Sequence, residues 1–112
     1  MNDLQAGLCE RFGVEFRPST ADAKLGLALA TLNERPINGL RHPPKGDTSG
    51  WYVWAGERLS SADDLFQPVH ADHLSEILPE IIPYLGLPPG WRFQVAPGHE
   101  DVWFDATLLN DR

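Results

Sequence analysis

The sequence predicts an α+β fold, in which an antiparallel sheet of about four strands packs against two helices. Three groups of residues indicate this fold. Residues 50–57 hold three large aromatic side chains within four positions, a composition that suits a pleated, half-buried strand. Residues 91–96 and 101–106 alternate between apolar and polar side chains, as two strands of a hairpin do. Residues 70–86 hold apolar side chains at helical spacing.

The composition is that of one globular domain over residues 1–112, with 42% hydrophobic and 22% charged residues. The net charge of −7 argues against nucleic-acid binding, which needs clustered Lys and Arg, and favours a basic partner. Cys9 is the only cysteine, so no internal disulfide forms. Without a secretory leader or an apolar run of about 18 residues, the sequence predicts a cytoplasmic protein that does not span a membrane.

The N-terminal segment, residues 1–18, is open between two interpretations. Leu4, Leu8 and Phe12 recur at helical spacing, whereas residues 12–17 alternate like a strand. Nothing in the segment decides between a short helix and an extended chain.

Residues 20–33 predict the first flanking helix. Thr20 suits a helix N-cap, and an apolar stripe at helical spacing follows it. Leu25, Leu27 and Leu29 also alternate, so a strand competes, but the length and the Leu and Ala content favour a helix. The stripe consists of Leu25, Ala28, Leu29 and Leu32.

Residues 37–42 and 50–56 predict a hairpin. The connection, residues 43–49, holds two prolines, which cannot donate to a strand ladder and therefore confine the pairing to what precedes them. Residues 58–69 are mostly polar and predict a loop, with only Leu65 and Phe66 entering the core.

The strand at 50–56 is apolar on both faces. Because side chains alternate across a strand, Trp51 and Val53 share one face, while Tyr52 and Trp54 share the other. Such a strand is usually central and covered on both sides.

The second flanking helix, residues 70–86, contains Pro79 and Pro83. An interior proline removes a helical hydrogen bond and costs about 3 kcal/mol. We therefore expect a break near residue 78, with Pro79 opening a second short helix. The strands 91–96 and 101–106 follow, joined by a loop.

The sequence offers little catalytic or metal chemistry. His70 and His73 have a spacing that metal ligands use, but no third or fourth ligand stands at a recognisable interval. Cys9 lacks a local nucleophile signature, and no nucleotide-binding motif occurs. We therefore predict no cofactor, no metal site and no catalytic residue. His42 and His99, near an aromatic pocket, remain the residues on which a ligand-binding or hydrolytic alternative would depend.

Acidic residues in the predicted loops lie beside the aromatic strands. Exposed aromatic side chains ringed by charge are typical of protein interfaces. The predicted partner-binding residues are Tyr52, Trp54, Asp63, Asp64, His99, Glu100 and Asp101.

Four motifs carry a resemblance to a known family. They are Asn38-Gly39-Leu40-Arg41-His42-Pro43-Pro44, Ser49-Gly50-Trp51-Tyr52-Val53-Trp54-Ala55-Gly56-Glu57, Tyr84-Leu85-Gly86-Leu87-Pro88-Pro89-Gly90-Trp91-Arg92-Phe93 and Asp101-Val102-Trp103-Phe104-Asp105. Residues 37–109 resemble the small bacterial immunity-protein-like domains of polymorphic toxin systems, which are related to domains of unknown function.

The resemblance implies an α+β fold with an antiparallel sheet flanked by helices. It also implies a non-enzymatic protein that binds and neutralises a cognate toxin in the cytoplasm of the producing cell. Together with the net charge, it leads to the hypothesis of an immunity-type protein that occludes a basic toxin. Two alternatives stay open: the domain built on His42 and His99, and an uncharacterised homodimer that associates through exposed aromatic residues.

Overall fold

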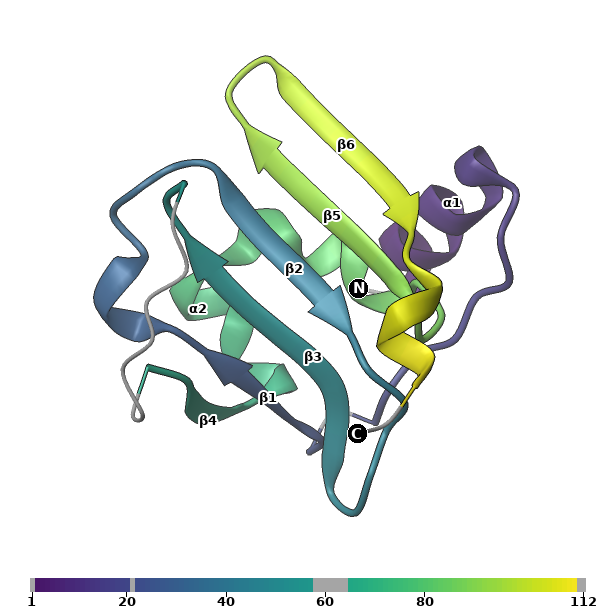
Figure 1. Ribbon diagram of the computed structural model, residues 1–112, viewed down its shortest axis with the longest axis horizontal. Coiled ribbons are helices and arrows are strands. Elements are labelled where there is room, and N and C mark those ends of the chain that lie inside the picture. The colour runs from purple at the N-terminus through teal and green to yellow at the C-terminus, as the bar shows by residue number, and fades with distance from the viewer. Residues whose placement is uncertain (1, 21, 58–64, 111–112) are drawn as a thin grey trace.

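The computed structural model describes residues 2–20, 22–57 and 65–110. Its centre is a six-stranded mixed sheet with the strand order β4-β1-β3-β2-β5-β6 (Figure 1). The strands are β1 (Lys24–Leu27), β2 (Ile37–Arg41), β3 (Thr48–Ala55), β4 (Gln67–His70), β5 (Trp91–Ala96) and β6 (His99–Phe104). The α-helices are α1 (Asn2–Phe12) and α2 (Leu74–Ile77), and the 3-10 helices are η1 (Leu29–Thr31), η2 (Ala71–His73), η3 (Pro79–Gly86) and η4 (Ala106–Leu109).

The α+β class is confirmed, but the sheet is larger than predicted and is not wholly antiparallel. β3 pairs with β2 in antiparallel fashion and with β1 in parallel, so it is an interior strand, as its apolar faces indicated. β2 also pairs with β5, and β5 with β6, both antiparallel. The strands predicted near 37–42, 50–56 and 91–96 are confirmed.

The predicted helix near 20–33 is wrong. The stretch forms β1 and the short η1, because β1 lies between β3 and β4 and buries Leu25 and Leu27 against the core. Gly26 fits beneath Tyr52 of β3: a Cβ added to it would lie 2.8 Å from the tyrosine ring. Pairing with two neighbours outweighs the modest helical preference of this stretch.

The loop predicted at 58–69 ends in a strand that the sequence analysis missed. β4 pairs with β1 in antiparallel register, with Pro68 opposite Gly26. It is short, polar and at the edge of the sheet, where a proline is tolerated. Residues 58–64 lie outside the described part of the chain.

The last strand begins earlier and ends earlier than the predicted 101–106. Pro97 and Gly98 make a tight turn, in which Gly98 takes a positive φ of 73°. His99 therefore already pairs with Ala96. After Phe104 the chain turns into η4, where the backbone N–H of Thr107 donates to the side chain of Asp105 at 3.1 Å.

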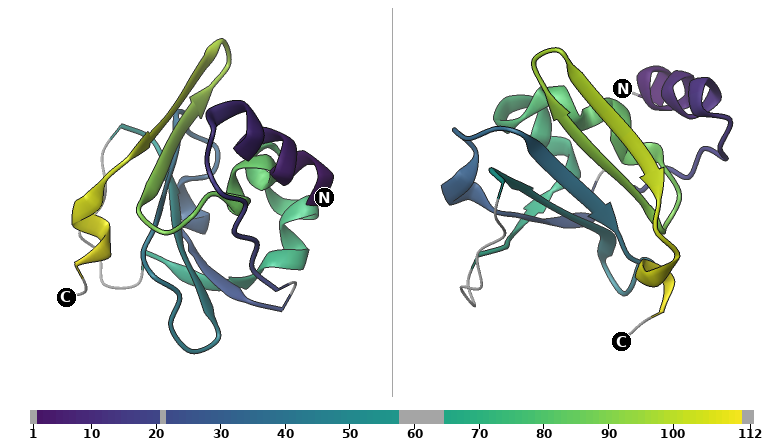
Figure 2. Two further views of the ribbon diagram at one scale, coloured as in Figure 1. Left: turned by 90° about the vertical axis from the view of Figure 1, so that its right-hand side faces the viewer. Right: turned by 45° about the horizontal axis from the view of Figure 1, so that its top comes forward.

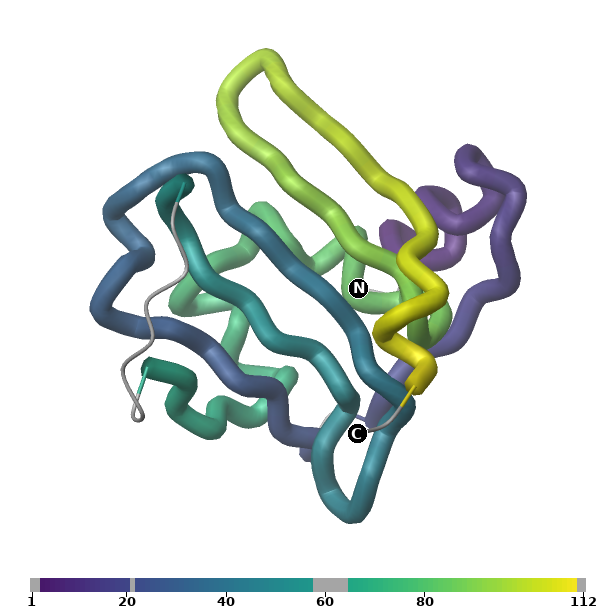
Figure 3. The backbone as a smooth tube through the Cα atoms, viewed as in Figure 1, coloured from purple at the N-terminus to yellow at the C-terminus, as the bar shows by residue number. Residues whose placement is uncertain are grey.

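The predicted helix at 70–86 is broken where the prolines require it. Leu78 has non-helical angles, φ −153° and ψ 67°, and Pro79 opens η3. His70 belongs to β4, and most of the remainder is 3-10 helix. At the N-terminus the helical alternative holds to Phe12, and the chain then runs without regular structure towards β1, as Figure 3 allows the reader to follow.

The core lies between the sheet and the helices. Trp51 is 1% exposed, packs on Phe93 at a ring distance of 5.5 Å and donates its indole N–H to the Leu85 carbonyl at 3.0 Å. Phe93 in turn stacks on Tyr84 at 4.9 Å. Gly39 leaves room for Phe93, because a Cβ there would lie 2.2 Å from its ring. Among the described residues, no helix has the length and apolar character needed to cross a membrane.

Candidate partner-binding face

The two faces of the sheet are covered differently. The helices α1, α2 and η3 lie against one face, which we call the helix face, as the left view of Figure 2 shows. On the opposite face, which we call the open face, Tyr52 and Trp54 of β3 lie beside Leu40 and Asn38 of β2. Continuing this register across the sheet, the open face includes Leu40, Asn38, Tyr52, Trp54, Arg92, Gln94, Trp103, Asp101 and His99.

A group of four aromatic rings occupies the β3 side of the open face. Phe66 contacts Tyr52 edge-on at a ring distance of 5.3 Å and Trp54 at 6.3 Å. His42 contacts Tyr52 edge-on at 5.7 Å. We call these rings of His42, Tyr52, Trp54 and Phe66 the aromatic cluster. Trp54 is only 7% exposed, whereas Tyr52 is 37% exposed, so the cluster buries one large ring and offers another to solvent.

The aromatic cluster walls a cavity of about 610 Å³ on the open face. Such a volume is that of an ordinary ligand or side-chain pocket. The imidazole of His42 is held at its rim by the carbonyl of Leu108, 3.2 Å from Nδ1. The lining of the cavity is mostly apolar, and Lys45 is the one charged side chain among its described residues. These residues are Leu40, His42, Pro43, Lys45, Thr48, Gly50, Tyr52, Trp54, Phe66 and Asn110.

A row of polar side chains continues the open face towards β6. The Asn38 amide donates to the carbonyl of Gly56 at 3.0 Å and accepts from the Gln94 amide at 3.0 Å. Gln94 then lies 3.0 Å from Nε2 of His99. Arg92 pairs with Asp105 at 3.1 Å. These side chains bond to one another, so the row is a fixed polar surface beside the aromatic cluster.

The structure separates the three residues His99, Glu100 and Asp101, which the sequence analysis had grouped. His99 and Asp101 lie on the open face with Tyr52 and Trp54. Glu100 points to the helix face, because side chains alternate along a strand.

There Glu100 accepts hydrogen bonds from Arg11 at 2.7 Å and from the Tyr84 hydroxyl at 2.5 Å. The Arg11 bond, followed by the Tyr84 bond, lowers the pKa of Glu100, and burial raises the pKa of Tyr84. Glu100 thus ties β6 to α1 and η3. Asp63 and Asp64 lie outside the described residues.

His42 and His99 do not form a joint site. His42 lines the cavity at the aromatic cluster, whereas His99 lines a separate cavity of about 360 Å³ beside Tyr84 and Pro97. His70 and His73 approach to a ring distance of 5.8 Å, but Nδ1 of His70 is 3.1 Å from the Asp22 carbonyl. The described residues include no cluster of three or more His, Cys, Asp and Glu side chains that would hold a metal ion.

Arg41, the last residue of β2, is 2% exposed. Its guanidinium donates to the carbonyls of Ser49, Arg17 and Leu87 at 2.9, 2.7 and 2.7 Å. Burial, and then the charge of Arg17, lower its pKa to about 10. Arg41 therefore joins β2, β3, the segment after α1 and the end of η3, and acts as a structural clamp.

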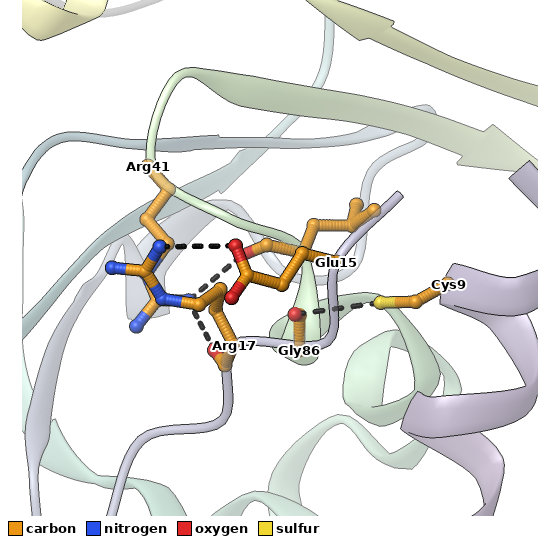
Figure 4. Close-up of polar contacts among 6 residues, drawn as sticks. Cys9, Glu15, Arg17, Arg41 and Gly86 are labelled. Carbon is orange, nitrogen blue, oxygen red and sulfur yellow. Dashed lines mark hydrogen bonds and ion pairs between the residues drawn. The ribbon is translucent and has the colours of Figure 1, made fainter. Parts of the chain in front are cut away.

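The same region holds the only cysteine, as Figure 4 shows. The Cys9 thiol lies 3.4 Å from the carbonyl of Gly86, and burial raises its pKa. A thiol with a raised pKa is a poor nucleophile, which agrees with a packing role.

Phe66 and Asn38 are residues of the open face that the sequence analysis did not select. Phe66 was expected in the core, and its place on the open face follows from β4, a strand that the sequence did not reveal. Asn38 could have been found, because it stands two residues before Leu40 in the predicted strand at 37–42 and therefore shares a face with it.

The fold is that of a small α+β domain: helices cover one side of its sheet, and the aromatic cluster with the partly exposed Tyr52 lies on the other. The family model of the Imm33-like domain matches residues 4–105, so the chain belongs to this family of immunity proteins. The match includes the N-terminal residues in which no resemblance was recognised. Searches of curated proteins and of solved structures gave no significant match.

Proposed function

We propose that this chain is an immunity protein that neutralises a toxin by binding it through the open face. The protein acts without a catalytic step, as one domain in the cytoplasm of the producing cell, and blocks the surface that the toxin needs for its activity. Family membership supports a toxin as the partner in general. The open face is proposed as the binding site because the aromatic cluster lines a cavity of about 610 Å³ there.

The aromatic cluster supplies what the centre of an interface requires. Binding energy concentrates in a few large side chains that fill desolvated pockets, with Tyr and Trp prominent among them. Tyr52 is held in place by Phe66 and His42, so little side-chain freedom is lost on binding. An apolar or aromatic side chain of the toxin would enter the cavity, and the polar row of Asn38, Gln94 and His99 would form part of the rim.

The charge balance supports a basic toxin. The chain has a net charge of −7, and Arg11, Lys24, Arg35 and Arg92 are neutralised by nearby carboxylates. Attraction to a basic toxin surface raises the rate of association and falls with ionic strength. The rate constant for association should therefore fall as salt is added, while the dissociation rate changes less.

Co-expression with a toxin domain that is encoded beside the gene, as gene sequencing would identify it, tests the proposal. The wild-type chain should restore growth and form a stoichiometric complex with the toxin, and Tyr52→Ala should lose both. Ile77 on α2 provides a matched control, because it is 39% exposed against 37% for Tyr52 but lies on the helical side. Ile77→Ala should protect like the wild type. If the wild-type chain neither protects nor forms a complex, the proposed function is wrong.

A further inference from the structure

β6 is a regular edge strand. It pairs with β5 over six consecutive positions without a bulge, from Trp91 opposite Phe104 to Ala96 opposite His99. The other edge, β4, has four residues, and Pro68 among them lacks an N–H group. Proteins usually protect edge strands by short length, prolines, bulges or charged side chains. β4 has the first two, whereas β6 has only charged side chains, Glu100 and Asp101.

The hydrogen-bond pattern identifies which backbone groups of β6 face outward. The Asp105 N–H donates to the Gly90 carbonyl at 2.7 Å, which marks this opposed pair as hydrogen-bonded. Hydrogen-bonded and non-bonded pairs alternate along an antiparallel ladder. Trp103, Asp101 and His99 therefore bond to β5, and the backbone groups of Glu100, Val102 and Phe104 point away from it. No other backbone bond to these three residues occurs within the described parts of the chain.

The helix α1 lies next to this edge of the sheet, on the helix face. It lies beyond β6 in Figure 1 and on the helix-face side of the sheet in the left view of Figure 2. Leu4, Gly7 and Arg11 fall on one side of the helix by their spacing, and Arg11 reaches Glu100 of β6. On this side Leu4 is 61% exposed and Gly7 has open space around it. A strand added to β6 would thus lie beside the exposed Leu4 and the open space around Gly7.

We propose that β6 binds an extended segment of the toxin as a seventh strand, with a Lys or Arg of that segment beside Asp101. This inference rests on the proposed function and names how the partner is held. Main-chain hydrogen bonds to Glu100, Val102 and Phe104 supply the attachment, as in other cases of strand addition. Asp101 lies on the open face of β6, which is three positions from β3 in the order of the sheet. A strand added next to β6 would therefore extend the proposed binding face beyond this edge.

Charge favours the toxin segment over a second copy of this chain. Asp101 is exposed and has no ion pair among the described residues. A cationic side chain directly opposite it on an added strand would be stabilising, and a carboxylate there would be destabilising. Two copies would each bring a net charge of −7.

The test is Val102→Pro, measured by binding of the toxin domain encoded beside the gene. Proline removes the outward N–H of Val102 and places its ring in the position of the added strand, but costs β5 no hydrogen bond. Val102→Ala is the matched control, because it also loses the valine side chain. We expect Val102→Pro to weaken binding at least about tenfold, Val102→Ala to bind like the wild type, and both to melt as single folded species.

A second measurement covers the case in which Val102→Pro does not fold. Hydrogen exchange on the wild-type chain should show fast exchange of the Glu100, Val102 and Phe104 amides, and protection of all three in the complex. Wild-type binding by a folded Val102→Pro variant, or no protection in the complex, would overturn strand addition and leave the proposed function standing.

Two further outcomes would also overturn the inference. If sedimentation of the protein alone reveals a dimer that Val102→Pro dissociates, the added strand comes from a second copy. If the wild-type chain does not bind the toxin at all, strand addition and the proposed function fail together.

Discussion

The two faces of β3 carry similar residues with opposite surroundings. On the helix face, Trp51 and Val53 are 1% and 0% exposed, and the one polar group of Trp51 has a carbonyl partner. On the open face, Tyr52 is 37% exposed and borders a cavity of about 610 Å³. The difference shows that aromatic content alone does not distinguish a buried face of a strand from a partly exposed one. The cover on each face decides, and it comes from segments distant in sequence.

The largest expected effect is on the helix face. Trp51→Ala removes a fully buried ring and leaves the Leu85 carbonyl without its donor, so we expect a loss of about 3–5 kcal/mol in the free energy of unfolding. Urea denaturation followed by circular dichroism measures it. A loss below about 1 kcal/mol would show that Trp51 is not packed as described.

Substitution of Arg41, at the edge of the same core, should also lower the free energy of unfolding. Arg41→Met keeps the apolar stem but leaves the carbonyls of Ser49, Arg17 and Leu87 without their donor, and we expect a loss of about 3 kcal/mol. Arg41→Lys keeps the charge and loses the planar fork, so it should fall between wild type and Arg41→Met. Equal stability of all three proteins in urea would contradict the clamp.

Glu100 gives a smaller, pH-dependent effect. Because Arg11 and Tyr84 lower its pKa in the folded chain, Glu100 stabilises the fold above the ordinary glutamate pKa of about 4.3. The stabilisation is lost as the pH falls through the lower, folded-state pKa. Glu100→Gln should cost less than about 1 kcal/mol at pH 7, since the pair is partly exposed. Melting temperatures of the two proteins should converge as the pH falls towards 3; a constant difference would refute the linkage.

The expected effect on stability is also small on the open face. Tyr52→Ala should cost less than about 1.5 kcal/mol, because the ring is partly exposed and is lost from a surface cluster. Denaturation with the same urea series as for Trp51→Ala gives the direct comparison. A loss as large as that of Trp51→Ala would make the aromatic cluster a second core.

The parts of the fold that the sequence predicted are those with strong local patterns. The aromatic strand, its partner at Ile37–Arg41 and the break before Pro79 follow from alternation and from proline chemistry. β1 and β4 have no such pattern. Leu25 and Leu27 fit a helix as well as a strand until β3 and β4 are placed on either side.

The residues of the open face could also be predicted only where the local sequence pattern was strong. The alternation along β3 correctly separated Tyr52 and Trp54 from the other face, but their neighbour Phe66 depends on β4. Glu100 was grouped with His99 and Asp101 because the strand was predicted to begin at 101. Once the strand begins at His99, alternation alone sends Glu100 to the helix face.

The central claim is that the open face, and not the helical side, contacts the toxin. The most direct measurement compares the dissociation constants of Tyr52→Glu and Ile77→Glu for the toxin domain encoded beside the gene. Both residues are exposed to a similar extent, at 37% and 39%, so the substitutions carry a similar risk to folding. We predict that Tyr52→Glu weakens binding at least about 30-fold and that Ile77→Glu binds like the wild type. Weakened binding by Ile77→Glu, with Tyr52→Glu unaffected, would contradict the account.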